Sequence, residues 1–320
     1  MSSSRSRVLL ASAVVATCGT GTHARPQLET RTLTHDGLQR EYFVHIPSNH
    51  MGKQPVPLVL AFHGGNGRAR TFARFTRMAE LSERHGFIAV FPQGVNRRWY
   101  DQRFASSDPA ADKMVDDVGF VRALLDALQR SYPIDPRRVY AMGMSNGGMF
   151  CQELAFEVSD AFAAVASVTG QIAVGPTPRT KPRERVSLLL MNGTDDPLVP
   201  YEGGDVITTL SPQRRHDASV RTRGRVLSTD ETLRFWVRHN RLNDEPAVED
   251  IPNLDADDGT TVVRKTWTDG NVSVVLYRIN GGGHTYPGGS QYLPRKMIGN
   301  TSFDFDAAEV IWDFFRKHSK

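Results

Sequence analysis

The sequence contains little cysteine: its 320 residues include only Cys18 and Cys151. A disulfide framework is therefore excluded for the mature chain, because Cys18 lies in an N-terminal region that is expected to be removed or lipidated. Cys151 is expected to be a small buried hydrophobic residue. An excess of one charge is also absent, since the formal net charge is only +4 and the arginines are spread along the chain. This pattern indicates a solvated surface and does not favour a nucleic-acid partner.

Long hydrophobic runs are missing, so no transmembrane span is expected. The apolar run at 8–16 follows Arg5 and Arg7 and is too short to cross a bilayer. Residues 1–24 therefore read as a signal peptide cleaved after Ala24, which predicts a secreted or periplasmic protein. Two alternatives stay open, a lipobox with lipidation at Cys18 and a disordered tail on a cytoplasmic protein.

Ligand motifs for metals and cofactors are missing as well. No cluster of residues has the spacing of a zinc site. The glycine-rich turn at 64–67 lacks the lysine of a phosphate-binding loop, which speaks against a nucleotide. No cofactor and no metal are expected.

Strand and helix patterns alternate along residues 25–320. This alternation with continuous apolar strands predicts an α/β fold, a doubly wound, mostly parallel sheet in a single catalytic domain. Strands are expected at 41–46, 56–62, 87–91, 139–144, 186–191 and 272–279, and helices at 69–84, 116–129 and 305–315. The Pro- and Arg-rich stretch 169–185 and the basic stretch 201–225 are expected to be loops over the functional site.

The segment 143–148 reads GMSNGG between an apolar strand and a helical pattern. This is the G-x-S-x-G nucleophile elbow of α/β-hydrolases in its strand–turn–helix setting. Gly143 and Gly147 are expected where side chains would collide with backbone, and Ser145 in a strained conformation. Ser145 is therefore the predicted nucleophile.

A serine nucleophile needs a base, and the base needs an orienting acid. In this fold the acid and then the base follow the serine, each on a loop after a strand. Asp195 and Asp196 follow the strand at 186–191, and Asp196 is the preferred acid. His284, on a glycine-rich loop after the last strand, is the predicted base.

An oxyanion hole is predicted from two backbone N–H groups, those of Asn146 after the nucleophile and of Gly65 in the turn after an early strand. The alternative for this turn is a simple flexible loop. His63 is expected to fix the turn and not to act in catalysis.

Six motifs recur in a fixed order, at residues 63–65, 115–120, 134–140, 143–148, 193–197 and 283–288. Together they resemble the polyhydroxybutyrate depolymerase-like serine esterases, which are related to feruloyl and acetylxylan esterases. The resemblance covers nearly all of the chain after the signal region. It implies secretion, a triad of Ser145, Asp196 and His284, and hydroxyalkanoate esters or oligomers as substrate.

The chain departs from the family pattern at Tyr286, where tryptophan is frequent, and in the long basic loop at 201–225. No additional substrate-binding domain is expected, which favours oligomers or soluble esters over crystalline polymer. Tyr286, Trp99 and Tyr201 are the predicted substrate-binding aromatics, with core packing as the alternative. The arginines of the basic loop are expected to be solvated, with attraction of a carboxylate-bearing substrate as the alternative.

Three functions compete at this point. The leading one is a serine carboxylic-ester hydrolase that works through an acyl-enzyme, acting on hydroxyalkanoate esters or on feruloyl and acetyl esters of plant polysaccharides. A peptidase or acyltransferase would use the same triad. A non-catalytic binding protein on this scaffold would lack a triad residue, and none is missing here. The oligomeric state is left open.

Overall fold

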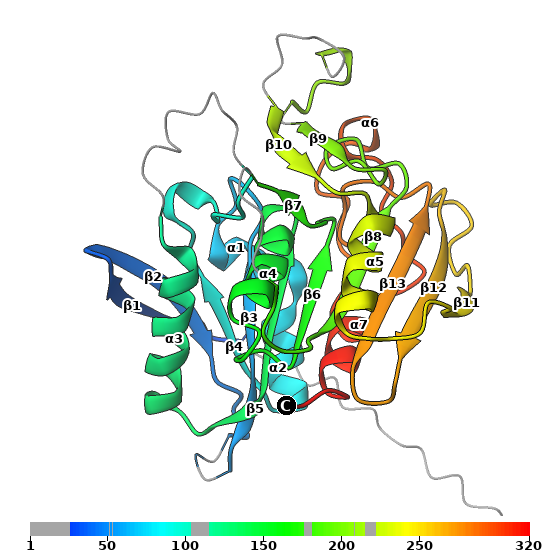
Figure 1. Ribbon diagram of the computed structural model, residues 1–320. Coiled ribbons are helices and arrows are strands. Elements are labelled where there is room, and N and C mark those ends of the chain that lie inside the picture. Colours follow the sequence, from blue (N-terminus) through cyan, green and yellow to red (C-terminus); the bar gives the residue numbers. More distant parts are fainter. Residues whose placement is uncertain are drawn as a thin grey trace, which may run out of the picture.

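The computed structural model describes residues 26–50, 52, 54–103, 115–175, 181–207, 209–214 and 222–320 (Figure 1). The expected signal peptide, with Cys18, lies outside the described residues, as do parts of the two expected loops. Within the described ranges, none of the helices has the length and apolar character needed to cross a membrane.

A ten-stranded mixed sheet runs through the molecule in the order β1-β2-β4-β3-β5-β6-β8-β13-β12-β11. The strands from β4 to β13 are mutually parallel, and antiparallel strands complete both edges. The mostly parallel sheet predicted from the sequence is therefore confirmed. Its strands are β1 (Glu29–His35), β2 (Leu38–His45), β3 (Val56–Phe62), β4 (Ile88–Pro92), β5 (Ile134–Met144), β6 (Ala164–Val168), β8 (Ser187–Gly193), β11 (Ala247–Ile251), β12 (Thr261–Thr268) and β13 (Ser273–Asn280).

Helices cover both faces of the sheet (Figure 1). Side chains from α3, α4 and α5 pack with one face, and those from α1, α2 and α7 with the other. The helices are α1 (Ala69–Thr76), α2 (Met78–His85), α3 (Asp117–Ser131), α4 (Asn146–Glu157), α5 (Thr229–His239), α6 (Arg295–Ile298) and α7 (Ala307–Phe315), with short 3-10 turns η1 (Val95–Arg97) and η3 (Pro212–Arg214). Burial of apolar surface in these two layers is the main force that holds the fold together.

The sequence predictions agree with the structure for those elements whose own residues carry a strong strand or helix pattern. The strand at 56–62 is found as β3, and Asp116 caps α3 by accepting a hydrogen bond from the Gly119 N–H at 2.8 Å. The single helix expected at 69–84 is wrong. Arg77 takes a left-handed conformation (φ 54°) and divides it into α1 and α2.

A second, three-stranded sheet lies above the carboxyl ends of the parallel strands (Figure 1). It consists of β7 (Ala173–Val174), β9 (Gly204–Ile207) and β10 (Thr222–Val226). The expectation that 201–225 is only a loop is therefore wrong for its described parts. Val206 and Val226 pack with Met149 of α4 and with Val199, so this small sheet is attached to the elements that carry the candidate residues.

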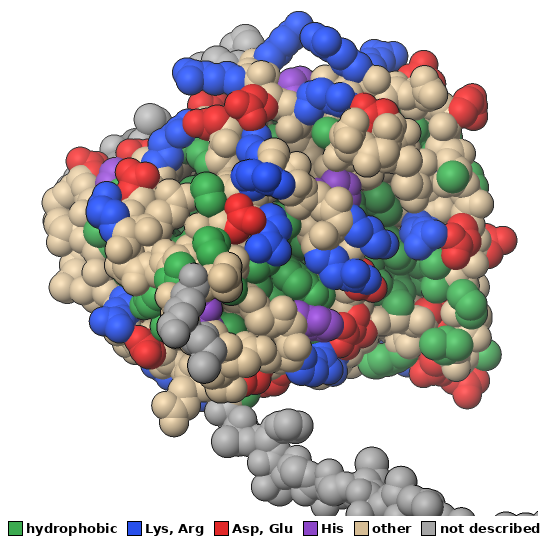
Figure 2. Space-filling view, turned by 90° about the horizontal axis from the view of Figure 1, so that it is seen from below, with side chains coloured by type: hydrophobic (Ala, Val, Ile, Leu, Met, Phe, Trp, Pro, Cys, Tyr) green, Lys and Arg blue, Asp and Glu red, His purple; other side chains and the backbone are tan. Residues whose placement is uncertain are grey.

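Charged side chains on the surface are interspersed by sign. In the view from below, Lys and Arg side chains lie among Asp and Glu side chains (Figure 2). Ion pairs such as Arg185–Asp269 and Arg316–Asp313 are largely exposed, so each contributes little to stability.

Candidate active site

Ser145 lies between the end of β5 and the start of α4, with φ 55° and ψ −122°. This backbone conformation is unfavourable for a residue with a Cβ atom and persists only where the surroundings enforce it. The surroundings here are backbone: a Cβ at Gly143 would lie 2.3 Å from the Gly147 carbonyl oxygen, and one at Gly147 would lie 2.1 Å from the Phe62 carbonyl oxygen. The two glycines of the motif thus permit the close approach that the sequence predicted.

Backbone hydrogen bonds hold Ser145 in place. Its N–H donates to the Val168 carbonyl at the end of β6, at 2.8 Å, and its carbonyl accepts from the Met149 N–H at 2.9 Å. The serine is therefore fixed at once to the neighbouring strand and to the first turn of α4. Strain in this turn is offset by these contacts.

Asp196 and His284 form a buried pair at the ends of two adjacent strands, β8 and β13. The His284 Nδ1–H donates to Asp196 Oδ2 at 2.7 Å, and the two side chains are 6% and 2% exposed. An ionised carboxylate only accepts hydrogen bonds, so the imidazole proton sits on Nδ1 and the lone pair of Nε2 is free. This is the tautomer that a general base requires.

The other oxygen of Asp196 accepts from the backbone N–H groups of Leu198 and Val199, both at 2.8 Å. The carboxylate is thereby oriented from two sides. Asp195, by contrast, is exposed and accepts from the Thr194 hydroxyl at 2.9 Å. The structure therefore brings His284 together with Asp196 and not with Asp195.

The strand order places Ser145, after β5, on the same edge of the sheet as Asp196 and His284. Among the described residues, no hydrogen bond joins the Ser145 hydroxyl to His284. Hydrogen bonds between catalytic groups are often long in the absence of substrate, and this arrangement is compatible with His284 as the base.

The turn at Gly64 and Gly65 lies beside Ser145 and Asn146. A Cβ on Gly64 would lie 3.5 Å from the Ser145 Cβ, and one on Gly65 would lie 3.8 Å from the Asn146 Cβ. In the described part of the chain, the N–H groups of Gly65 and Asn146 have no hydrogen-bond acceptor. Asn146 is also the first residue of α4, where the helix leaves N–H groups free for an anion.

The Asn146 side chain anchors the loop that follows η1. Its oxygen accepts from the Trp99 N–H at 2.8 Å, and its amide donates to the Trp99 carbonyl at 2.8 Å and to Asp101 Oδ2 at 2.7 Å. Asp101 is also paired with Arg103. Asn146 thus fixes its own backbone by its side chain, a role that the sequence analysis did not predict.

His63 fixes the Gly64 turn, as expected. The Gly94 N–H donates to its Nε2 at 3.0 Å, so the proton sits on Nδ1 and is donated to the Gly64 carbonyl at 2.8 Å. Burial lowers the pKa of His63. A neutral imidazole with both nitrogens engaged is a structural element of this turn and no competitor for the role of base.

The three predicted substrate-binding aromatics are buried, which favours the alternative of core packing. Tyr286 is 1% exposed and lies beside Phe75, and Trp99 is 3% exposed and stacks on Phe150. Tyr201 is 7% exposed, and burial raises its pKa to about 12. In each case packing against neighbouring elements determines the position.

The aromatic residue that the sequence analysis missed is Tyr292. Its hydroxyl donates to the His284 carbonyl at 2.7 Å, while the residue as a whole remains 40% exposed. Its place eight residues after His284, on the same loop, was the available signal.

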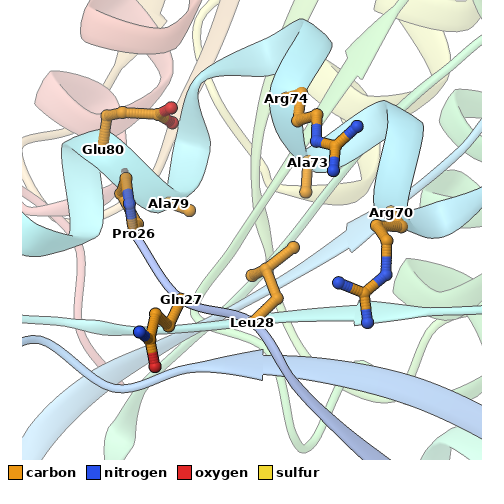
Figure 3. A pocket seen from close by; sticks show the side chains of 8 residues that line it. All are labelled: Pro26, Gln27, Leu28, Arg70, Ala73, Arg74, Ala79 and Glu80. Atoms are coloured by element: carbon orange, nitrogen blue, oxygen red, sulfur yellow. The ribbon is translucent and has the colours of Figure 1, made fainter. Parts of the chain in front are cut away.

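A cavity of about 310 Å³ lies elsewhere, between α1, α2 and the segment before β1 (Figure 3). It is lined by Pro26, Gln27, Leu28, Arg70, Ala73, Arg74, Ala79 and Glu80. None of the candidate residues borders it, so it is separate from the site around Ser145.

Comparison with known proteins identifies the family. The model of the family described as Esterase PHB depolymerase matches residues 41–177. NocK from Nocardia uniformis subsp. tsuyamanensis, which is named as an esterase, is 31% identical over 313 residues, which are 95% of this chain and 88% of NocK. The chain belongs to this esterase family. The protein is thus a serine esterase.

Other known proteins are similar to the esterase over part of its length. Feruloyl esterase B from Piromyces equi is 26% identical over 250 residues, 77% of the esterase but 42% of that enzyme. The solved structure of an acetyl xylan esterase from Aspergillus awamori has a TM-score of 0.53 and 18% identity, and the match covers 81% of the esterase and 94% of that chain. At this identity the likeness shows the α/β-hydrolase fold alone.

Proposed function

We propose that the esterase hydrolyses carboxylic esters through an acyl-enzyme on Ser145, with His284 as the base and Asp196 as the acid. The observation that carries the proposal is the buried Asp196–His284 hydrogen bond at the same sheet edge as the strained Ser145 turn. Structural histidine–carboxylate pairs are common, but their coincidence with a nucleophile elbow is typical of hydrolases.

In the first half of the reaction, the Ser145 hydroxyl attacks the ester carbonyl while Nε2 of His284 takes its proton. The negative charge that develops on the carbonyl oxygen is stabilised by the free N–H groups of Gly65 and Asn146. His284 then returns the proton to the leaving alcohol. In the second half, a water molecule attacks the acyl group while His284 takes its proton, and His284 then returns this proton to the Ser145 oxygen as the acid leaves.

Two substrate classes are supported by different observations. Hydroxyalkanoate esters or oligomers are the first, because the family model is that of the PHB depolymerase esterases. Esters of plant polysaccharides are the second, because related proteins are named feruloyl esterase and acetylxylan esterase. We also propose that the enzyme is secreted, on the basis of the signal-peptide pattern of residues 1–24.

The nucleophile is tested with Ser145→Ala in hydrolysis of a short p-nitrophenyl ester. We expect a loss of kcat by at least about 10⁴-fold and of labelling by a fluorophosphonate probe. Ser131→Ala, on the exposed end of α3, is the matched control and should keep both. Turnover near the wild-type rate in Ser145→Ala would show that another residue carries the reaction.

A further inference from the structure

Tyr292 holds the loop that carries His284. Its hydroxyl donates to the His284 carbonyl at 2.7 Å, and the His284 N–H donates to the Ile298 carbonyl at 2.6 Å. Both backbone polar groups of His284 are therefore bonded within the segment that leads from His284 to the end of α6. The orientation of the imidazole depends on this segment as well as on Asp196.

Tyr292 is fixed by its neighbours and yet partly exposed. It packs edge-on against Phe75, with 5.6 Å between ring centroids, and Phe75 in turn packs against the buried Tyr286 at 5.6 Å. Tyr292 is 40% exposed, whereas Tyr286, Trp99 and Tyr201 are each at most 7% exposed. An aromatic ring held at both its hydroxyl and its edge presents a preorganised apolar surface to a ligand.

The hydroxyl of Tyr292 lies on the side of the candidate acid and base. Burial of the hydroxyl and the negative charge of Asp196 raise the pKa of Tyr292, so that it stays protonated and remains a hydrogen-bond donor. Tyr292 is therefore close to the pair and cannot replace His284 as a base.

The position of a ring beside the base determines which part of an ester it meets. In the proposed reaction His284 protonates the leaving alcohol, so groups beside His284 lie beside the alcohol part of the ester. A flat apolar surface there suits an alcohol that carries a ring, either an aromatic ring or the C–H face of a sugar, better than a short open chain.

We propose that Tyr292 positions the base through its hydroxyl and selects ring-bearing alcohols through its exposed ring. This inference rests on the proposed function of Ser145, Asp196 and His284. Of the two substrate classes above it favours the polysaccharide esters, because their alcohol part is a sugar ring, whereas the alcohol part of a hydroxyalkanoate oligomer is an open chain.

The test separates the two roles with two substrates that share the acetyl group, ethyl acetate and benzyl acetate. Tyr292→Phe removes only the hydroxyl, and we expect kcat to fall about 3- to 10-fold for both esters with KM unchanged. Tyr292→Leu also removes the ring, and we expect in addition a rise in KM of about 3- to 10-fold for benzyl acetate only. Phe303→Leu is the matched control, since Phe303 is likewise an aromatic residue with 41% exposure and its backbone N–H donates to Asp258.

A second measurement makes the result independent of the folding of Tyr292→Leu. Benzyl alcohol should inhibit ethyl acetate hydrolysis equally in wild type and Tyr292→Phe, and more strongly than ethanol does. Equal KM changes for both esters in Tyr292→Leu, or equal inhibition by both alcohols, would overturn the specificity role. An unchanged kcat in Tyr292→Phe would overturn the positioning role. Activity retained in Ser145→Ala would instead show that the proposed function itself is wrong, whatever the Tyr292 variants do.

Discussion

Replacing Asp196 by asparagine tests the acid at the one point where the sequence left two neighbouring carboxylates. Asp196 accepts hydrogen bonds from His284 Nδ1 at 2.7 Å and from two backbone N–H groups at 2.8 Å. An asparagine has one oxygen for these donors, and its amide group is itself a donor. If the oxygen stays with Leu198 and Val199, the amide faces His284 and favours the imidazole tautomer with the proton on Nε2.

In that tautomer His284 cannot take the proton of Ser145. The same substitution in a serine protease triad lowers kcat by about 10⁴-fold for this reason, and we expect a loss of about 10³- to 10⁴-fold in the esterase. The loop after β8 keeps its two backbone hydrogen bonds, so the fold loses one charge-assisted hydrogen bond. We expect the free energy of unfolding to decrease by only about 1.5–3 kcal/mol.

The assay is steady-state hydrolysis of a p-nitrophenyl ester together with urea unfolding. Asp195→Asn is the matched control, because Asp195 is exposed and its neutral analogue should keep the side-chain hydrogen bond from Thr194 and the wild-type rate. A rate loss in Asp195→Asn combined with normal turnover in Asp196→Asn would refute the assignment. Equal, large losses of stability in both variants would refute the reasoning on tautomers.

Two further predictions concern the scaffold of the site. Gly147→Ala should lower stability by about 1–3 kcal/mol and also lower kcat, because its methyl group would meet the Phe62 carbonyl oxygen at 2.1 Å; thermal unfolding should show no such loss for Gly65→Ala, whose methyl group has an ordinary contact. The depressed pKa of buried His63 means that the unfolded chain binds a proton below about pH 6.5 that the folded protein does not. Stability should be full above that pH and decrease as the pH falls through the folded-state pKa, and His63→Gln should reduce this decrease in urea unfolding; an unchanged pH dependence would exclude His63 as its source.

Local signals allowed much of the fold and the candidate site to be predicted. The elbow depends on glycines within five residues of one another, and the capping Asp116 lies beside its helix, so both are visible in sequence. Continuous apolar runs revealed β3, β8 and β13 because parallel strands are buried on both faces. The order of Ser145, Asp196 and His284 after such strands then indicated the site.

The features that the sequence did not reveal are the break at Arg77 and the exposure of two tyrosines, and the tyrosines depend on packing between distant segments. The break at Arg77 needs a left-handed residue for which no glycine or asparagine gives a signal. The burial of Tyr286 and the exposure of Tyr292 follow from their contacts with Phe75, more than 200 residues away along the chain. Whether an aromatic side chain faces the core or the solvent is decided by such contacts, and a loop sequence carries no periodicity that predicts it.

The bond between Asp196 and His284 joins residues 88 positions apart, and Ser145 lies on a third strand. Bringing residues of such large sequence separation together is entropically unfavourable, because it closes a long loop. The chain therefore has to incorporate β13, the last of its parallel strands, before Asp196 and His284 can meet. Recovery of esterase activity after dilution from denaturant is therefore expected to require that β13 has joined the sheet, and not only that the elbow at Ser145 has formed.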